Sequence, residues 1–106
     1  MKVYLSGPIS GLSSDEAREA FARASLATLL GGHEPINPFD IPPPPNCSCL
    51  GAEGHSWACC LRGDLAVLIE CDAIYMLPGW ERSHGARLEL SVAAAVGLKV
   101  FGVGNA

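Results

Sequence analysis

The stretch that decides the fold is residues 71–97, CDAIYMLPGWERSHGARLELSVAAAVG. Residues 73–77 are apolar and predict a buried strand, and residues 78–85 form a proline- and glycine-containing loop that leads into a helix. Glu89 stands in that helix, about one turn beyond the loop. Open α/β sheets bind their ligands just beyond the carboxyl ends of the strands. A carboxylate at this position therefore indicates a functional site.

The rest of the chain alternates strands with helices. Ser13 and Glu16 form a capping box before the first helix, and two glycines end that helix. Asn37 follows the second strand, where it either anchors the loop backbone or touches a ligand. The expected elements are strand 2–6, helix 14–30, strand 34–37, helix 57–70, strand 73–77, the helix that follows Gly85 and runs to residue 96, and strand 99–103.

This alternation predicts the fold class. Strands that are separated by helices pair in parallel, and right-handed crossovers place the helices on both faces of the sheet. We expect one α/β domain of Rossmann or flavodoxin type, which is a three-layer sandwich with a four-stranded parallel sheet of order 2-1-3-4. That order places the loop at residues 7–11 beside the loop at residues 78–85.

The composition limits the classes of function. The chain has 106 residues, 49% of them hydrophobic and 17% charged, which suits one domain over residues 1–106 with a modest core. The net charge of −4 argues against a nucleic-acid polymer as partner. No apolar run approaches the roughly 18 residues that span a membrane, and the chain opens with a strand instead of a signal peptide. We expect a cytoplasmic protein and, given its size, a homodimer.

A segment rich in proline and cysteine interrupts the alternation at about residues 40–56. Four consecutive prolines predict a stiff stretch inside an otherwise flexible loop, and two interpretations remain open: a lid over the site or a mobile surface excursion. Zinc ligands are usually paired with two to four residues between them, so the Cys-x-Cys and Cys-Cys spacings here favour reduced cysteines. We expect neither a metal nor a cofactor. The residues in question are Cys47, Cys49, His55, Cys59 and Cys60.

The loop Gly-Pro-Ile-Ser-Gly at residues 7–11 joins a strand to a helix. Its glycines permit close approach, and its backbone N–H groups can hold a phosphate or a sugar hydroxyl. It lacks the lysine of a Walker A loop and the spacing of a dinucleotide fingerprint. By itself it is a weak indication of a binding site.

Two acids can face the same crevice. From spacing alone, Asp64 and Glu89 are each interpreted as an exposed helix acid beside a neighbouring arginine. Their two helices nevertheless point toward the predicted crevice, and paired carboxylates at one sugar can act as nucleophile and general acid. Trp80 either stacks on a nucleobase or packs against the proline loop. His84 is a candidate phosphate contact, although an exposed histidine needs no function.

Three motifs lie around the predicted crevice: Gly7-x-Ile9-x-Gly11, Asp64-Leu65 followed by Asp72, and Ser83-x-Gly85 followed by Glu89. Together they resemble the nucleoside 2-deoxyribosyltransferase superfamily, whose nearest characterised branch is 2′-deoxynucleoside 5′-phosphate N-hydrolase. The chain also resembles small phage and bacterial members of that superfamily. The resemblance covers nearly all of the chain outside the proline loop.

The resemblance implies cleavage or transfer at the N-glycosidic bond of a 2′-deoxynucleoside or its 5′-monophosphate, through a glycosyl-enzyme intermediate. It implies that Glu89 attacks C1′, that Asp64 helps to protonate the departing base, and that Tyr4 lines the site. A nucleoside or nucleotide is then the partner molecule. The expected substrate-binding residues are Gly7, Ile9, Ser10, Gly11, Trp80, Ser83, His84 and Gly85.

Besides a structural metal protein, which rests only on the cysteine-rich segment, two other functions remain open. One is a phosphoribohydrolase of the lysine-decarboxylase-like type, whose Pro-Gly-Gly-x-Gly-Thr-x-x-Glu motif is echoed around Gly85 and Glu89 without its second glycine and its threonine. The other is a module that binds or sequesters a nucleotide without turnover. Ser10 stands where the hydrolase branch has an arginine, which favours the second alternative slightly.

Overall fold

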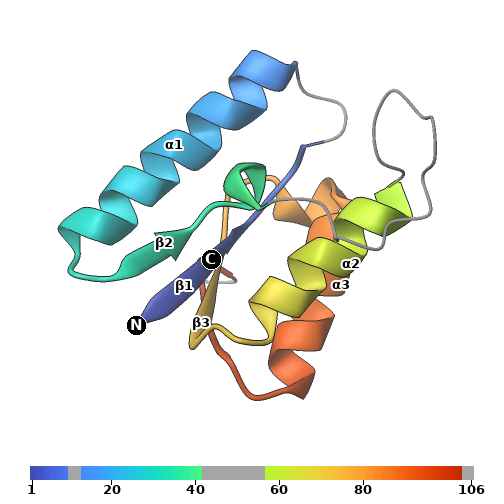
Figure 1. The fold of residues 1–106 in the computed structure, drawn as a ribbon. Helices are drawn as coiled ribbons and strands as arrows, with labels where there is room; N and C mark the ends of the chain where they lie inside the picture. Colours follow the sequence, from blue (N-terminus) through green and yellow to red (C-terminus); the bar gives the residue numbers. More distant parts are fainter. Residues whose placement is uncertain (10–12, 42–56, 104–106) are drawn as a thin grey trace.

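The computed structural model describes residues 1–9, 13–41 and 57–103 (Figure 1). These residues form a four-stranded sheet with α-helices packed against it. The elements are β1 (Lys2–Ser6), α1 (Ser14–Leu30), β2 (Glu34–Ile36), the 3-10 helix η1 (Pro38–Asp40), α2 (Trp57–Leu68), β3 (Ala73–Met76), the 3-10 helix η2 (Trp80–Arg82), α3 (His84–Ala95) and β4 (Lys99–Phe101).

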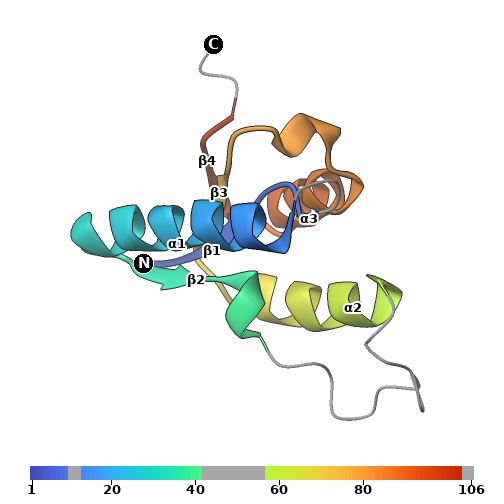
Figure 2. The same cartoon turned by 90° about the horizontal axis from the view of Figure 1, so that it is seen from above.

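The sheet is parallel throughout, and its strand order is β2-β1-β3-β4. The predicted order 2-1-3-4 is therefore confirmed. β1 lies between β2 and β3, and Tyr4 is in register with Ile36 on one side and Ile74 on the other. Seen from above, β2 and β4 lie toward opposite edges of the sheet (Figure 2). The carboxyl ends of β1 and β3 are consequently neighbours at the centre.

Helices cover both faces of the sheet, as the alternation predicted (Figure 1). On one face, Val3 and Leu5 of β1 pack with Phe21 of α1. On the other face, Tyr4 packs with residues of α2 and α3 such as Leu68 and Ala86. Successive side chains of a strand point to opposite faces, so the alternation within β1 divides the core into these two halves.

The ends of several elements differ from the predicted ends by one or two residues. β3 ends at Met76, and the chain then turns, with the N–H of Trp80 donating to the carbonyl of Leu77. The sequence did not predict η1 or η2, because single 3-10 turns have no periodic signature. Asn37 caps η1, its side-chain oxygen accepting a hydrogen bond from the N–H of Phe39 at 3.0 Å. This bond agrees with the interpretation that Asn37 anchors the loop backbone.

Part of the predicted loop lies outside the described residues, namely positions 42–56, and so do Ser10 and Gly11. The two interpretations of the loop, and the roles predicted for Ser10 and Gly11, therefore stay predictions. Within the described ranges, none of the helices combines the length and hydropathy that crossing a bilayer requires.

Ser25 on α1 offers a test of the packing on the α1 face. Its hydroxyl oxygen is buried and has no hydrogen-bond partner among the described residues. Removing a buried, unsatisfied hydroxyl relieves its desolvation cost, and alanine favours the helix. We expect Ser25→Ala to raise the free energy of unfolding by about 1 kcal/mol, and the melting temperature by about 4–8 °C, in thermal unfolding.

Ser91→Ala is the matched control, because the Ser91 hydroxyl is exposed on α3 and donates to the carbonyl of Arg87. Its melting temperature is expected to stay within about 2 °C of that of the wild type. A lower melting temperature for Ser25→Ala would mean that the Ser25 hydroxyl has a partner and would contradict the prediction.

Candidate active site

A buried carboxylate lies where α3 packs against the centre of the sheet. Glu89 is only 7% exposed. Its Oε2 accepts a hydrogen bond from the Tyr4 hydroxyl at 2.6 Å, and its Oε1 accepts one from the Ser6 hydroxyl, also at 2.6 Å. Tyr4 and Ser6 are two residues apart on β1 and so project from the same face of the strand. Both carboxylate oxygens are therefore held by neutral donors from one strand.

The burial of Glu89 follows from the spacing of small residues on α3. Ala86 and Ala93 are both buried against the sheet, and Glu89 lies between them at positions that share a helix face. The face that packs α3 onto the sheet therefore carries the carboxylate inward as well. A buried polar group is costly unless it is hydrogen-bonded, and the two hydroxyls meet that need.

A second carboxyl, Asp64 on α2, is coupled to the first. Asp64 is half-buried; this burial, with a smaller contribution from the charge of Glu89, raises its pKa to about 7. Burial also raises the pKa of Glu89, although the hydrogen bonds from Ser6 and Tyr4 oppose that shift. Neither acid is therefore the exposed helix acid that spacing alone suggested.

Tyr4 stays protonated at any ordinary pH. Burial raises the pKa of its hydroxyl first, and the charges of Glu89 and Asp64 raise it further. The Tyr4 hydroxyl is therefore a permanent donor to Glu89. Tyr4, Ser6 and Glu89 thus form a hydrogen-bonded cluster where α3 meets β1, and Asp64 on α2 interacts with this cluster through charge.

The loops after β1 and β3 lie side by side where they are described. The N–H of Leu77 donates to the carbonyl of Ser6 at 2.7 Å. Gly79 has φ of +89°, a conformation that favours glycine, and a Cβ there would approach Cγ of Pro8 to 3.3 Å. The prediction that these two loops are neighbours is confirmed for their described residues, 7–9 and 78–85.

Gly7 is the tightest point of this junction. A Cβ on Gly7 would lie 2.7 Å from Cβ of Leu77, closer than two such carbons can pack, so the ends of β1 and β3 would have to separate. We expect Gly7→Ala to lower the free energy of unfolding by about 1–3 kcal/mol in denaturant titrations.

Gly31→Ala is the matched control for Gly7→Ala, since Gly31 has φ of −79° and a Cβ there would meet no atom closer than 3.5 Å. Its stability is expected to change little. Equal stability of Gly7→Ala and the wild type would mean that the ends of β1 and β3 can separate at little cost, and it would contradict the prediction.

The other residues predicted to bind substrate lie around the loop before α3. The Ser83 side chain caps α3 by accepting from the N–H of Ala86 at 3.2 Å. Trp80 opens η2 and packs, half-buried, against the cluster that contains Tyr4 and Met76. Ile9 and His84 are exposed, and Gly85 lies in the first turn of α3. The binding roles of these residues stay predictions.

Ser6 is the residue that the sequence reasoning missed. It is fully buried at the end of β1 and donates to Glu89, which is 83 positions away in the chain. A signal was present, because Ser6 is polar, stands at the end of a strand that also contains the apolar Val3 and Leu5, and shares a face with Tyr4. Two polar groups on one buried strand face indicate a shared partner.

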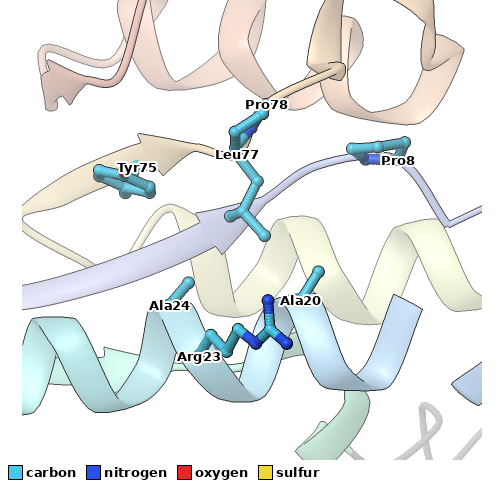
Figure 3. A pocket seen from close by; sticks show the side chains of 7 residues that line it. All are labelled: Pro8, Ala20, Arg23, Ala24, Tyr75, Leu77 and Pro78. Carbon is cyan, nitrogen blue, oxygen red and sulfur yellow. The ribbon is translucent and has the colours of Figure 1, made fainter. Parts of the chain in front are cut away.

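A separate pocket of about 360 Å³ lies on the opposite face of the sheet, between α1 and β3 (Figure 3). The Leu77 side chain points toward α1 in this view, away from the face that carries Glu89. The pocket is therefore distinct from the carboxylate cluster. It is lined by Pro8, Ala20, Arg23, Ala24, Tyr75, Leu77 and Pro78.

Within the described residues, no group of three His, Cys, Asp or Glu side chains is placed to hold a metal ion. Cys71 is buried, and its thiol donates to the carbonyl of Val67 at 3.4 Å. Burial raises the pKa of this thiol, which makes it a weak nucleophile. Positions 47, 49 and 55 of the cysteine-rich segment lie outside the described ranges.

Comparison with known proteins assigns the family. The model of the family "Domain of unknown function (DUF4406)" matches residues 1–102. The chain belongs to the DUF4406 family. A comparison of this DUF4406 chain with curated proteins gave no significant match.

Among solved structures, the DUF4406 chain is similar to the CMP N-glycosidase BcmB of Clostridium botulinum. The two share 22% sequence identity with a TM-score of 0.59, and the alignment covers 94% of this chain and 66% of that chain. The DUF4406 chain thus spans slightly less than two thirds of that protein. The likeness confirms the predicted α/β fold.

Proposed function

We propose that the chain is an N-glycosidase of the nucleoside 2-deoxyribosyltransferase superfamily, acting on a 2′-deoxynucleoside or its 5′-monophosphate. The observation that carries this proposal is the buried Glu89 carboxylate, held by Tyr4 and Ser6 and coupled to Asp64. The likeness in fold to a protein described as a CMP N-glycosidase supports it.

The two carboxyls fit different roles. Like charges in one buried site resist simultaneous ionisation, so a single proton is favoured on the pair. Glu89 accepts two hydroxyl hydrogen bonds that favour its ionised form, whereas burial and the charge of Glu89 hold the pKa of Asp64 near 7. The proton therefore resides mainly on Asp64, which makes Glu89 the nucleophile and Asp64 the acid.

The proposed reaction follows from this division. A Glu89 oxygen attacks C1′ of the sugar and forms a glycosyl ester, while the C1′–N bond breaks and its electron pair leaves with the base. Asp64 gives its proton to the departing base. Water then attacks C1′ and gives a proton back to Asp64, which frees the sugar and Glu89; a second base in place of water gives transfer.

Charge and sugar chemistry point to the class of substrate. The positive charge that develops at C1′ is stabilised by the Glu89 carboxylate beneath it. A 2′-deoxy sugar lacks the electron-withdrawing hydroxyl and forms its cation more easily. The amino end of α3, which begins at His84, is suited to a 5′-phosphate, because the helix dipole favours an anion there.

The proposal is tested by chromatography of free base released from the four deoxynucleoside 5′-monophosphates, the matching deoxynucleosides and CMP. We expect base release that depends on the protein, with deoxynucleotides preferred over CMP. Incubation with a second base distinguishes transfer from hydrolysis. No release from any of these compounds, with or without the second base, would contradict the proposal, and nucleotide binding without turnover would then support a sequestering module.

A further inference from the structure

We propose that Ser6 is a positioning residue for Glu89: its hydroxyl fixes the carboxylate plane so that one face of the carboxylate is presented to C1′. This inference rests on the proposed function. The Ser6 side chain is 1% exposed and that of Tyr4 is 0% exposed, and each donates to a different oxygen of Glu89. The sequence motifs that suggested a site did not include Ser6.

Two hydrogen bonds fix the plane of the Glu89 carboxylate, which one hydrogen bond alone does not do. The terminal torsion of a glutamate side chain is broad, so the side chain alone does not fix the plane of its carboxylate. With the Tyr4 bond alone, the carboxylate can pivot about Oε2. The Ser6 bond to Oε1 removes that freedom. A carboxylate has about four lone-pair positions, so two remain for the reacting carbon and for a neighbouring donor.

The backbone of Ser6 is itself rigid. Ser6 is in register with Met76 of β3, and its carbonyl accepts from the N–H of Leu77 at 2.7 Å. It lies on β1, one of the two central strands of the sheet. A donor on such an element holds its acceptor more exactly than a donor on a loop would.

Ser6 also acts on the charge of Glu89 without carrying one. In the part of the chain that the structure describes, the titratable side chains that interact with Glu89 are Tyr4 of β1 and Asp64 of α2. The core cluster that contains Tyr4 also includes Ile74 from β3, Val100 from β4 and the thiol of Cys71, which acts on Tyr4. The Ser6 hydroxyl therefore provides a neutral donor that favours the ionised form of the nucleophile.

The test uses the full chain with Ser6→Ala and Ser6→Cys, the second of which nearly keeps the side-chain volume but donates weakly. The pKa of Glu89 is read in substrate-free protein by carbon NMR of its carboxyl group. We expect Ser6→Ala to raise this pKa by about one unit, since a hydrogen bond to a charged group is lost. Ser6→Cys should fall between wild type and Ser6→Ala.

Turnover gives the second measurement. For Ser6→Ala we expect kcat to fall about tenfold to a hundredfold with KM nearly unchanged, and the acidic limb of the pH profile to move upward with the pKa of Glu89. Ser91→Ala, on the exposed face of α3, should leave both quantities unchanged. If Ser6 had only a structural role, Ser6→Ala would lower the melting temperature and would change neither the pKa of Glu89 nor the pH profile.

The two proposals fail separately. If wild-type protein releases no base, the proposed function fails, while the carboxyl titration still reports whether Ser6 holds Glu89. If wild-type protein is active and Ser6→Ala changes neither the pKa of Glu89 nor kcat, the role of Ser6 is overturned and the function stands.

Discussion

Replacement of Glu89 by glutamine is expected to lower kcat for base release by about 10³-fold or more, while the chain stays folded. Glutamine keeps the shape of the side chain, and its oxygen can still accept from Tyr4 or Ser6. It cannot supply the anion that bonds to C1′ or stabilise the positive charge there. The measurement is single-turnover base release followed by chromatography.

The stability of Glu89→Gln should not fall with its activity, and it should equal or exceed that of the wild type. A carboxyl whose pKa is raised on folding stabilises the fold below its unfolded pKa, and this contribution is lost as the pH rises through the folded pKa. Burial raises the pKa of Glu89 in this way. Glutamine does not ionise, so the variant should melt at least as high as wild type above neutral pH, with the difference shrinking near pH 4.

Glu70→Gln is the control, because Glu70 is exposed between α2 and β3, at the opposite end of the sheet from the site. Activity and melting temperature should both match those of wild type. Base release by Glu89→Gln within a few-fold of wild type would remove Glu89 from the chemistry, even if the fold and the substrate binding were intact.

The fold was predictable because local patterns identify its elements. Alternation along residues 2–6 and helical spacing along residues 14–30 are properties of short stretches, and right-handed crossovers with helices on both faces then favour the observed strand order. The contact between Ser6 and Glu89 is different in kind. It joins residues 83 positions apart and depends on the register of β1 and on the rotation of α3. No local pattern specifies either.

The burial of Asp64 and Glu89 could be predicted in part from the sequence. Asp64 falls on the same helical stripe as Leu61, Leu65 and Leu68, and Glu89 falls between Ala86 and Ala93. An acid on an apolar stripe indicates a buried carboxyl, yet arginines near both acids favoured the interpretation of exposed ion pairs. What the stripe could not show is that the charge of Glu89 acts on Asp64, since that depends on the packing of α2 beside α3.

Replacement of Asp64 by asparagine is expected to lower kcat about 10²- to 10³-fold and to change the form of the pH profile. Burial, helped by the charge of Glu89, raises the pKa of Asp64 to about 7, so its proton is available below about pH 7 and lost above it. Wild-type activity should therefore fall as the pH rises through about 7. It should fall on the acidic side as Glu89 becomes protonated.

The leaving group distinguishes this role from a structural one. A 4-nitrophenyl deoxyriboside departs without needing a proton, so Asp64→Asn should cleave it nearly as well as wild type does, and Glu89→Gln should not cleave it. For natural bases the falling limb near pH 7 should disappear in Asp64→Asn. Equal losses on both kinds of substrate would show that Asp64 supports the site without donating the proton.

The coupling between the acids gives the strictest check on their assignment. The charge of Glu89 is the smaller of the two causes that raise the pKa of Asp64, and burial is the larger. In Glu89→Gln that charge is absent, so the pKa of Asp64 should fall from about 7 but stay above that of an exposed aspartate. Carbon NMR of the Asp64 carboxyl measures this directly. An unchanged pKa would mean that the carboxyls do not interact, and the sharing of one proton between them, on which the assignment of nucleophile and acid depends, would be wrong.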